Sequence, residues 1–536
     1  MALTPHRRFN AVTLVALAAG VLVCLPIATI VTLGLVGQSD VWGHLVDTLL
    51  AQYLMNSLGL VIGVAAGVLL LGVPSAALVS LTDFPGRRAL SLALLLPLAF
   101  PAYILAYTYT GLLDAAGPVA RWVDPRTLDS IRSLPGAALM LSLVLYPYVY
   151  LLARASFLSR SASTLEVGRT LGLTPLQATI KLALPMARPA IVAGLTLALM
   201  ETLADYGTVA FFGVPTFTTG IMRAYYGLGD AVAAAQLALT LLAFVALLVL
   251  LEKYSRRKLR YFSGASRRSH SRVRLHGWRA GLAMSVCALP PLLGFAVPGC
   301  ALLWWGMVDA RDQWWDLGPM AASSFGLASM AALLLVMSAL ALGYAERTAP
   351  SRLTRGLTQI AGLGYALPGT IIAVGVLIPL AKADQWLFVM FRDYVGVNVG
   401  LLFTGSVAAV LVAYGARFTA VSLGAITSGL GRIKPSLDEA AMLLGHRPLQ
   451  IVRRVHVPLM RGAVLTSALV VFVDVLKELP ATLILRPFDF NTLAVRAYEL
   501  ASDERLLDAA PASLMIVAVG LIPVIYLNRS VSEAKY

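Results

Sequence analysis

Four acidic side chains stand in stretches of this chain that are otherwise apolar. Glu201 and Asp205 lie four residues apart, and Asp474 and Glu478 repeat the pair 273 residues later in the 536-residue sequence. On a continuous helix this spacing places both members of a pair on one face. Carboxylates are hard oxygen ligands that attract cations, so the two pairs could guide a metal ion or another cation through a protein interior.

Two interpretations of these acids are open. In one, the carboxylates pair with the neighbouring Lys477 and hold helices together. In the other, they line a pathway in which the phenol of Tyr206 supplies a further oxygen ligand. If the first helix enters a bilayer near residue 189, Glu201 lies about 18 Å along it, close to the midplane. Ionisable side chains at that depth are costly and normally face a bundle interior or a pathway, which favours the second interpretation.

The composition is that of a polytopic membrane protein. Apolar residues make up 59% of the sequence and charged residues 13%, which is too apolar for a soluble protein of this length. The net charge of +15 would suit nucleic-acid binding, but the basic residues cluster in alternate loops, as membrane orientation requires. The basic stretch 253–280 is therefore interpreted as a linker near anionic lipid headgroups, and no nucleic-acid partner is expected.

Apolar stretches of about 20 residues are long enough to cross a bilayer as helices. Their pattern predicts an all-α fold of about twelve transmembrane helices. Basic residues collect in the loops on one side, which predicts that both termini and the polar segments described next face the cytoplasm. The predicted spans are 11–36, 54–80, 90–113, 136–153, 189–212, 232–251, 281–306, 321–345, 357–381, 400–427, 462–487 and 510–527.

One polar segment between apolar stretches occurs twice. Residues 163–189 and 436–462 align without a gap at the offset of 273, and each contains Pro-Leu-Gln three residues after a glycine. Each copy is predicted to form a capped short helix, a left-handed turn at the glycine, and a second short helix that a proline ends. The residues involved are Ser163, Glu166, Gly172, Thr174 and Pro185, and in the second copy Ser436, Glu439, Gly445, Arg447 and Pro458.

A further matching pair supports a duplication of the whole chain. Ala99-Phe100-Pro101-Ala102 corresponds to Ala366-Leu367-Pro368-Gly369. The chain is therefore predicted to consist of two homologous six-helix halves, residues 1–252 and 281–536, joined by the linker 253–280. Because an even number of spans separates the copies, the halves are expected to run parallel.

The repeated segments resemble the coupling loops of type I ABC importer permeases, which carry the pattern E-A-A, then Gly, then Pro. The matching residues are Glu439, Ala440, Ala441, Gly445 and Pro458 in the second copy and, less closely, Glu166, Gly168, Gly172 and Pro185 in the first. The resemblance implies the type I permease fold and a single copy of this chain that docks two copies of an ABC ATPase.

An enzymatic role is not predicted. The chain lacks the phosphate loop G-x-x-x-x-G-K-[ST], so ATP and Mg²⁺ are expected on the separate ATPase, and no cofactor on this chain. His446 and His456 in the second repeat lack a neighbouring nucleophile or ligand set and are expected to serve docking or solvation.

Two stretches around the acids also resemble the fused permeases of ferric-iron importers. They are ADYGTVAFFGV at 204–214 and KELPATLILRPFDFNTLAVR at 477–496. The resemblance implies import of Fe(III) from a periplasmic iron-binding protein across the bacterial inner membrane. A stable metal site is not expected, only transient contact of the ion with the pathway residues Glu201, Asp205, Tyr206, Asp474, Lys477 and Glu478. A permease for another small solute such as thiamine or a polyamine stays open, as does, less favoured, a secondary transporter without an ATPase.

Overall fold

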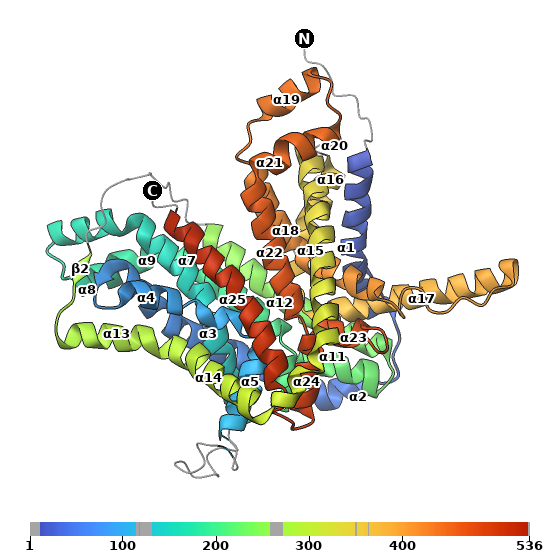
Figure 1. The fold of residues 1–536 in the computed structure, drawn as a ribbon, viewed down its shortest axis with the longest axis horizontal. Helices are drawn as coiled ribbons and strands as arrows, with labels where there is room; N and C mark the ends of the chain where they lie inside the picture. The colour runs from blue at the N-terminus through green and yellow to red at the C-terminus, as the bar shows by residue number, and fades with distance from the viewer. Residues whose placement is uncertain are drawn as a thin grey trace. The chain divides into compact units, whose positions relative to one another are not determined.

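The computed structural model describes residues 11–113, 117, 131–257, 272–348, 351–362 and 364–533 (Figure 1). The regular structure of these residues is helical, apart from two two-residue strands, β1 (Thr82–Asp83) and β2 (Val273–Arg274), which pair in parallel. The all-α prediction is thus confirmed. Residues 1–10 and 534–536, at the predicted cytoplasmic ends of the chain, and half of the linker, 258–271, lie outside the described residues.

The helices of the first half are α1 (Ala11–Val36), α2 (Trp42–Leu45), α3 (Ala51–Leu81), α4 (Arg87–Ala93), α5 (Ala102–Leu113), α7 (Leu134–Thr170), α8 (Pro175–Ala178), α9 (Leu184–Ala204), α10 (Gly207–Phe211), α11 (Phe217–Met222) and α12 (Ala231–Arg257). Those of the second half are α13 (Trp278–Pro291), α14 (Val297–Trp304), α15 (Leu317–Thr348), α16 (Arg352–Ala361), α17 (Gly369–Val395), α18 (Val407–Leu430), α19 (Pro435–Leu443), α20 (Pro448–Ile451), α21 (Val457–Leu459), α22 (Arg461–Leu476), α23 (Pro480–Leu485), α24 (Leu493–Ser502) and α25 (Ala510–Glu533).

Eight helical stretches among the described residues are long and apolar enough to cross a membrane, or up to ten if each of two bent pairs is one span. The bent pairs are Arg87–Ala99 with Ala102–Leu113, at 95°, and Pro448–Leu459 with Arg461–Leu476, at 87°. The first and last predicted spans fall on the shorter apolar helices Gly20–Val36 and Ala510–Ile525. The predicted spans fall on apolar helices, several of which are broken, and the number of crossings stays a prediction.

Several of the predicted spans are not single helices. The stretch 357–381 was expected to be one helix, but the chain breaks between α16 and α17. Pro368 is the N-cap of α17 in an extended conformation, just as Pro101 directly precedes α5. Proline has no amide hydrogen to donate and disfavours helix in the residue before it, so the matching prolines mark the same break in both halves.

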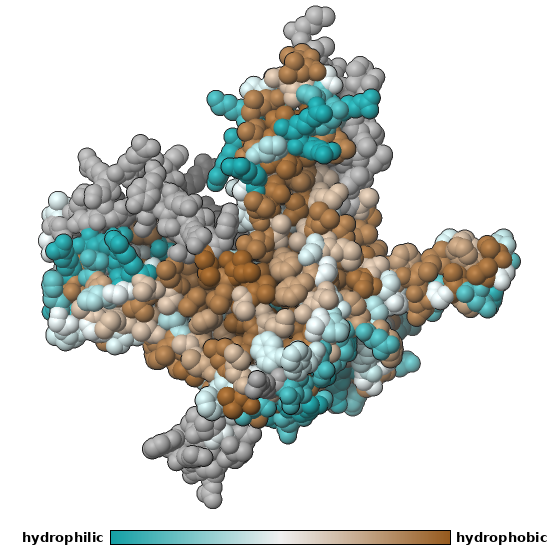
Figure 2. All heavy atoms as spheres, in the orientation of Figure 1, coloured by the Kyte–Doolittle hydropathy of each residue, from teal (hydrophilic) through white to brown (hydrophobic). Residues whose placement is uncertain are grey.

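Residue contacts divide the chain into two compact units, and neither corresponds to one half of the sequence. Unit 1 consists of Met1–Gly43, Gly220–Leu239 and Trp315–Arg496. In it, α1 from the first half packs against α15, α16, α17 and α18 from the second. Val23 of α1 shares a buried cluster with Leu342 and Ile426. Apolar side chains extend along this bundle, and hydrophilic ones gather near α20 (Figure 2).

Unit 2 also combines helices from both halves of the sequence. It consists of His44–Thr219, Thr240–Trp314 and Ala497–Tyr536, and α13, the first helix of the second half, packs against α3 and α4 of the first. Its core is the packing of α3, α7 and α9, in which small residues permit close approach. A Cβ atom at Gly194 of α9 would lie 2.8 Å from the carbonyl oxygen of Tyr148 in α7, so a larger side chain would separate the two helices.

Candidate functional site

The first repeat begins within a long helix. α7 continues unbroken through Ser163 and Glu166 to Thr170, so the predicted helix start and capping box at Ser163 are wrong. The side chain of Glu166 lies outside the described residues. The predicted glycine turn is confirmed: Gly172 has φ = +70°, and the amide of Leu173 donates to the carbonyl of Gly168 at 2.9 Å. This six-residue bond closes a left-handed helix end.

The next cap in the first repeat has the predicted form. The hydroxyl of Thr174 accepts from the amide of Gln177 at 3.3 Å, and the Gln177 side chain accepts from the amide of Thr174 at 3.0 Å. Pro175 follows as the first residue of α8, where its missing amide hydrogen costs no helical bond.

The second repeat forms the same turn. The amide of Gly445, at φ = +82°, donates to Met442, and that of His446 donates to Ala441 at 3.1 Å. The predicted capping box at Ser436 is wrong, because Lys434 is the N-cap of α19 and makes no side-chain cap bond. Pro435 takes the first helical position, which moves Ser436 inside the helix.

Gly168 and Ala441 are equivalent and both need to be small. A Cβ atom at Gly168 would lie 2.7 Å from the Cβ of Ala178 in α8. Ala441 is buried, whereas its neighbours Glu439 and Ala440 are exposed. Each small residue thus lets the helix before the turn lie close to the helix after it.

Two pairs of leucines, which the sequence analysis missed, are exposed at the turns. Leu171 and Leu444 precede the glycines and are 63% and 78% exposed; Leu176 and Leu449 follow them and are 70% and 69% exposed. Each pair is separated by the same 273 residues as the repeats. Large apolar side chains that are exposed at polar turns are typical of a protein interface. The duplicated Pro-Leu-Gln sequence was the signal that could have identified them.

The proline of the first repeat does not end a helix as predicted, whereas in the second repeat a helix ends one residue after the proline. Each proline follows a π turn, at Thr179–Ala183 and Val452–His456, in which an amide bonds five residues back, Leu184 to Thr179 and Val457 to Val452. The wider turn removes the clash that proline causes in an α-helix, so the chain continues helically through Pro185. In the second copy the helix bends at Met460, two residues beyond Pro458.

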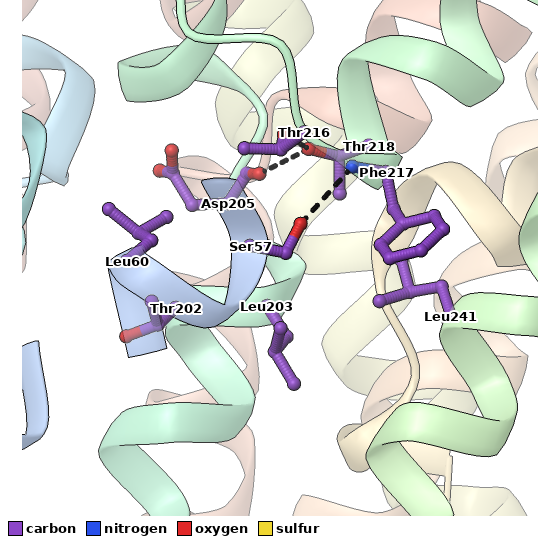
Figure 3. A pocket seen from close by; sticks show the side chains of 9 residues that line it. All are labelled: Ser57, Leu60, Thr202, Leu203, Asp205, Thr216, Phe217, Thr218 and Leu241. Atoms are coloured by element: carbon purple, nitrogen blue, oxygen red, sulfur yellow. Dashed lines mark hydrogen bonds between the residues drawn. The ribbon is translucent and has the colours of Figure 1, made fainter. Parts of the chain in front are cut away.

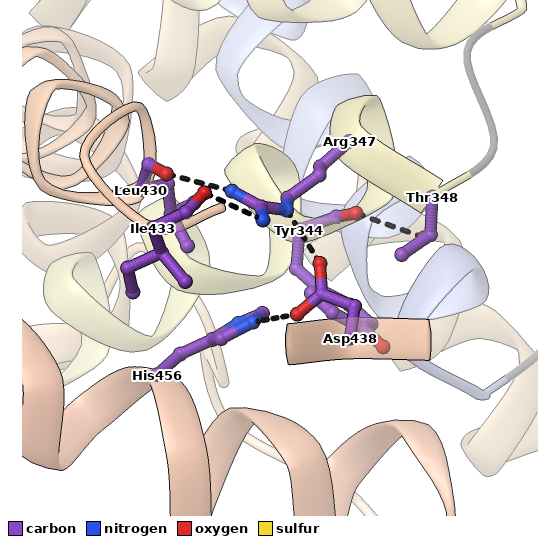
Figure 4. A network of polar contacts seen from close by, with 7 residues as sticks. All are labelled: Tyr344, Arg347, Thr348, Leu430, Ile433, Asp438 and His456. Carbon is purple, nitrogen blue, oxygen red and sulfur yellow. Dashed lines mark hydrogen bonds and ion pairs between the residues drawn. The ribbon is translucent and has the colours of Figure 1, made fainter. Parts of the chain in front are cut away.

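A polar network anchors the second repeat (Figure 4). Asp438 in α19 accepts from the guanidinium of Arg347 in α15 at 2.6 Å and lies 2.5 Å from Nε2 of His456. Arg347 also donates to the carbonyls of Leu430 and Ile433. His456 is completely buried, so its predicted role in docking or solvation is wrong. The first repeat has Leu165 and Ala183 at the positions of the aspartate and histidine.

The first acidic pair, Glu201 and Asp205, spans the end of a helix. α9 stops at Ala204, so the prediction that Glu201 and Asp205 share one helix face is wrong. The carboxylate of Asp205 instead accepts from the amides of Thr208 and Val209 and from the Thr208 hydroxyl, which caps α10. Its carbonyl accepts from the hydroxyl of Thr218 (Figure 3). A cavity of about 10 Å³ at this break has room for about one water molecule.

The second acidic pair is divided in the same way. α22 stops at Leu476, and Glu478 accepts from the amides of Ala481 and Thr482 at the start of α23. Its buried carboxylate also forms an ion pair with Arg417 of α18 at 3.1 Å. The sequence analysis missed Arg417, which is 61 residues away along the chain. Glu478 and Asp205 thus each stabilise a helix break with the same type of cap.

The remaining predicted pathway residues lie either one helical turn before the ends of α9 and α22 or directly after those ends. Asp474 pairs with Lys477 at 2.9 Å, and Glu201 is half-buried in α9. The ring of Tyr206 lies 6.0 Å from that of Tyr498, which lies 6.3 Å from Tyr103. Unit 2 therefore brings three phenols together near one acidic break, and two of them were not anticipated. Among the described residues, no three His, Cys, Asp or Glu side chains form a group that could hold a metal ion.

Comparisons with known proteins agree with this architecture. Residues 68–261 match the family "Binding-protein-dependent transport system inner membrane component". The Fe(3+)-transport system permease protein FbpB 2 of Haemophilus influenzae is 25% identical over 532 residues, which cover 98% of this chain and 99% of the relative.

Shorter alignments reach permeases named for other substrates. The putative 2-aminoethylphosphonate transport system permease protein PhnU of Salmonella typhimurium is 27% identical over 32% of this chain and 62% of its own length. The sulfate transport system permease protein CysT of Escherichia coli is 28% identical over 24% of this chain and 46% of its own. Residues 68–261 thus resemble the binding-protein-dependent transport system inner membrane components, and almost the whole chain is similar to a protein named as a permease.

Proposed function

We propose that this chain is the permease of an ATP-driven importer that passes Fe(III) from a periplasmic binding protein into the cytoplasm. The observation that supports this substrate is the group of oxygen donors at the break after α9, where the rings of Tyr206 and Tyr498 lie 6.0 Å apart next to Asp205. Phenols and carboxylates are the ligand types that a hard trivalent cation prefers. The alignment of nearly the whole chain with a relative named for Fe(3+) transport supports the same substrate.

The repeated turns are proposed to dock two copies of the ATPase, one at each turn. The exposed leucine pairs supply apolar contact at matched positions, and Glu439 is exposed beside them. Gly172 and Gly445 fix the direction of each turn, while Gly168 and Ala441 keep its two helices close. Pro185 and Pro458 connect each turn to the helix that carries the acids, so movement of the turn would be transmitted to the helix break. Glu166 and Ala440 belong to the same element by the repeat.

The acids are proposed to divide into two roles. Asp205 and Glu478 preserve the helix breaks, because their carboxylates are occupied by backbone amides. Glu201, one turn before the first break, and the phenol of Tyr206 would contact the ion. In the second half Lys477 partly neutralises Asp474, so the first half is expected to attract a cation more strongly.

Uptake by two conservative variants tests this assignment. Glu201→Gln and Tyr206→Phe preserve shape but remove a charge or a phenolic oxygen. Each is expected to lower iron uptake in proteoliposomes by about tenfold, the effect of one lost charge-assisted contact. Melting temperature and ATP hydrolysis should not change. Tyr394→Phe is the matched control, since Tyr394 is 87% exposed. Wild-type uptake by the stable double variant Glu201→Gln/Tyr206→Phe would exclude the pathway role.

An oxyanion is the second candidate substrate, because relatives are named for sulfate and 2-aminoethylphosphonate transport. The two candidates make opposite predictions for the Glu201→Gln variant. Removal of a negative charge should weaken transport of a cation and should strengthen, or leave unchanged, transport of an anion. Competition by sulfate, 2-aminoethylphosphonate, thiamine and a polyamine in the same uptake assay would distinguish iron from each alternative.

A further inference from the structure

Four arginines of unit 2 gather where the chain enters α13, far along the sequence from the acidic breaks. We call Arg87, Arg88, Arg154 and Arg272 the arginine cluster. The parallel pairing of β1 with β2 sets Val273 opposite Thr82, and the amide of Leu275 donates to the carbonyl of Asp83 at 2.9 Å. Arg272 is therefore held beside the turn from which α4 begins with Arg87 and Arg88.

A second contact brings Arg154 to the same place. The hydroxyl of Tyr150 in α7 donates to the carbonyl of Ser91 in α4 at 3.0 Å. Arg154 stands one helical turn after Tyr150, and Arg87 stands one turn before Ser91. The positive charges of both arginines act on the Tyr150 hydroxyl, so both lie near this bond.

The charges of the cluster are poorly balanced by the surrounding described residues. Arg87 pairs with Asp83 at 3.0 Å, but that carboxylate is half exposed. The Nε atoms of Arg154 and Arg272 are buried and have no hydrogen-bond partner among the residues that the structure describes. Burial, together with the charges of Arg87, Arg154 and Arg88, lowers the pKa of Arg272, and the opposing effect of Asp83 does not cancel this. Buried guanidinium donors that repel one another and lack an acceptor are costly.

We propose that the arginine cluster binds a phosphate group, supplied by the headgroup of an anionic lipid such as phosphatidylglycerol or by free phosphate. A phosphate offers several acceptor oxygens and matches the planar fork of a guanidinium in bidentate geometry. Basic pockets beside membrane helices are suited to anionic headgroups. The bound anion would satisfy Arg154 and Arg272 and tie the start of the second half, at β2, to α4 and α7 of the first.

Lipid binding to the full-length protein tests this proposal. The purified chain in neutral detergent is titrated with phosphatidylglycerol, phosphatidylcholine or inorganic phosphate, and melting temperature and native mass spectra are recorded. Phosphatidylglycerol is expected to bind and to raise the melting temperature, whereas phosphatidylcholine should not. Arg154→Gln and Arg272→Gln are each expected to weaken binding by about tenfold, and the double variant by more. Arg355→Gln, an exposed arginine in α16 of unit 1, is the control and should bind as the wild type does.

The possible outcomes distinguish a lipid headgroup from free phosphate as the ligand, and ligand binding from a purely structural role of the arginine cluster. Equal stabilisation by inorganic phosphate alone would identify free phosphate as the ligand and preserve the site. Because the substitutions relieve repulsion, the lipid-free melting temperature of Arg272→Gln should equal or exceed that of the wild type. Unchanged phosphatidylglycerol affinity in the double variant, or no binding of either probe to the wild type, would overturn the proposal. If the double variant does not fold, Arg272→Lys, which retains the charge but loses the bidentate fork, should still weaken binding; wild-type affinity there would also overturn it.

Discussion

Replacement of Gly445 by valine should lower ATP-driven uptake by about tenfold or more while the protein stays folded. Gly445 has φ = +82°, a conformation that costs an L-residue about 1–2 kcal/mol, more for a β-branched side chain. A loss of this size is too small to unfold a protein with many membrane helices. It is large enough to open the turn that presents Leu444 and Leu449, and so to change the surface offered to the ATPase.

The measurement compares iron uptake with ATP hydrolysis in proteoliposomes that contain the ATPase. Gly172→Val should have the same effect through the other turn, where φ is +70°. Gly462→Val is the matched control, because Gly462 lies in α22 with ordinary dihedral angles and open space around its Cα atom. Uptake by Gly445→Val at the rate of Gly462→Val would show that the turn does not couple the two subunits.

Glu478→Gln should lower the free energy of unfolding by about 3–5 kcal/mol, the usual effect of removing one member of a buried ion pair. The change leaves Arg417 without its anionic partner and weakens the cap of α23. Thermal unfolding in detergent should show a clear fall in melting temperature, whereas Asp503→Asn, at an exposed position, should show none.

A double-mutant cycle distinguishes the ion pair from the cap. If the pair matters, the effects of Glu478→Gln and Arg417→Gln should be less than additive, because either change alone already breaks it. Additive effects would assign the loss to the cap of α23 alone, whereas a wild-type melting temperature for Glu478→Gln would contradict a structural role for Glu478. The carboxylate would then be available to line the pathway, as the sequence alone had suggested.

The parts of the repeats that could be predicted from the sequence depend on local stereochemistry. Gly172 and Gly445 are both in the left-handed conformation, and Thr174 caps α8 with Gln177, because turns and caps are decided within a few residues. The predicted caps at Ser163 and Ser436 are wrong because neighbouring residues decide where a helix begins. Pro435 takes the first helical position of α19, and α7 continues through the cap signal at Ser163.

The acidic site could be predicted only in part. The matching positions of Asp205 and Glu478 are evident from the 273-residue offset, but an acid four residues after another also fits a helix face, and this interpretation concealed the breaks. The same residues fit an N-cap, since each is followed by a threonine three or four positions later. Arg417 and Tyr498 come from distant segments, and the exchange of α1 and α13 between the halves depends on tertiary packing that no local pattern encodes.

Uptake of radioactive iron by proteoliposomes that contain this chain, its ATPase and its binding protein tests the central claim most directly. ATP is supplied on the side of the ATPase, and Fe(III) with the binding protein on the other. We expect iron to accumulate only when all three proteins and ATP are present, with sulfate and 2-aminoethylphosphonate failing to accumulate. Iron entry without the ATPase would instead indicate a secondary transporter. ATP-dependent accumulation of an oxyanion, without iron, would contradict the proposed substrate.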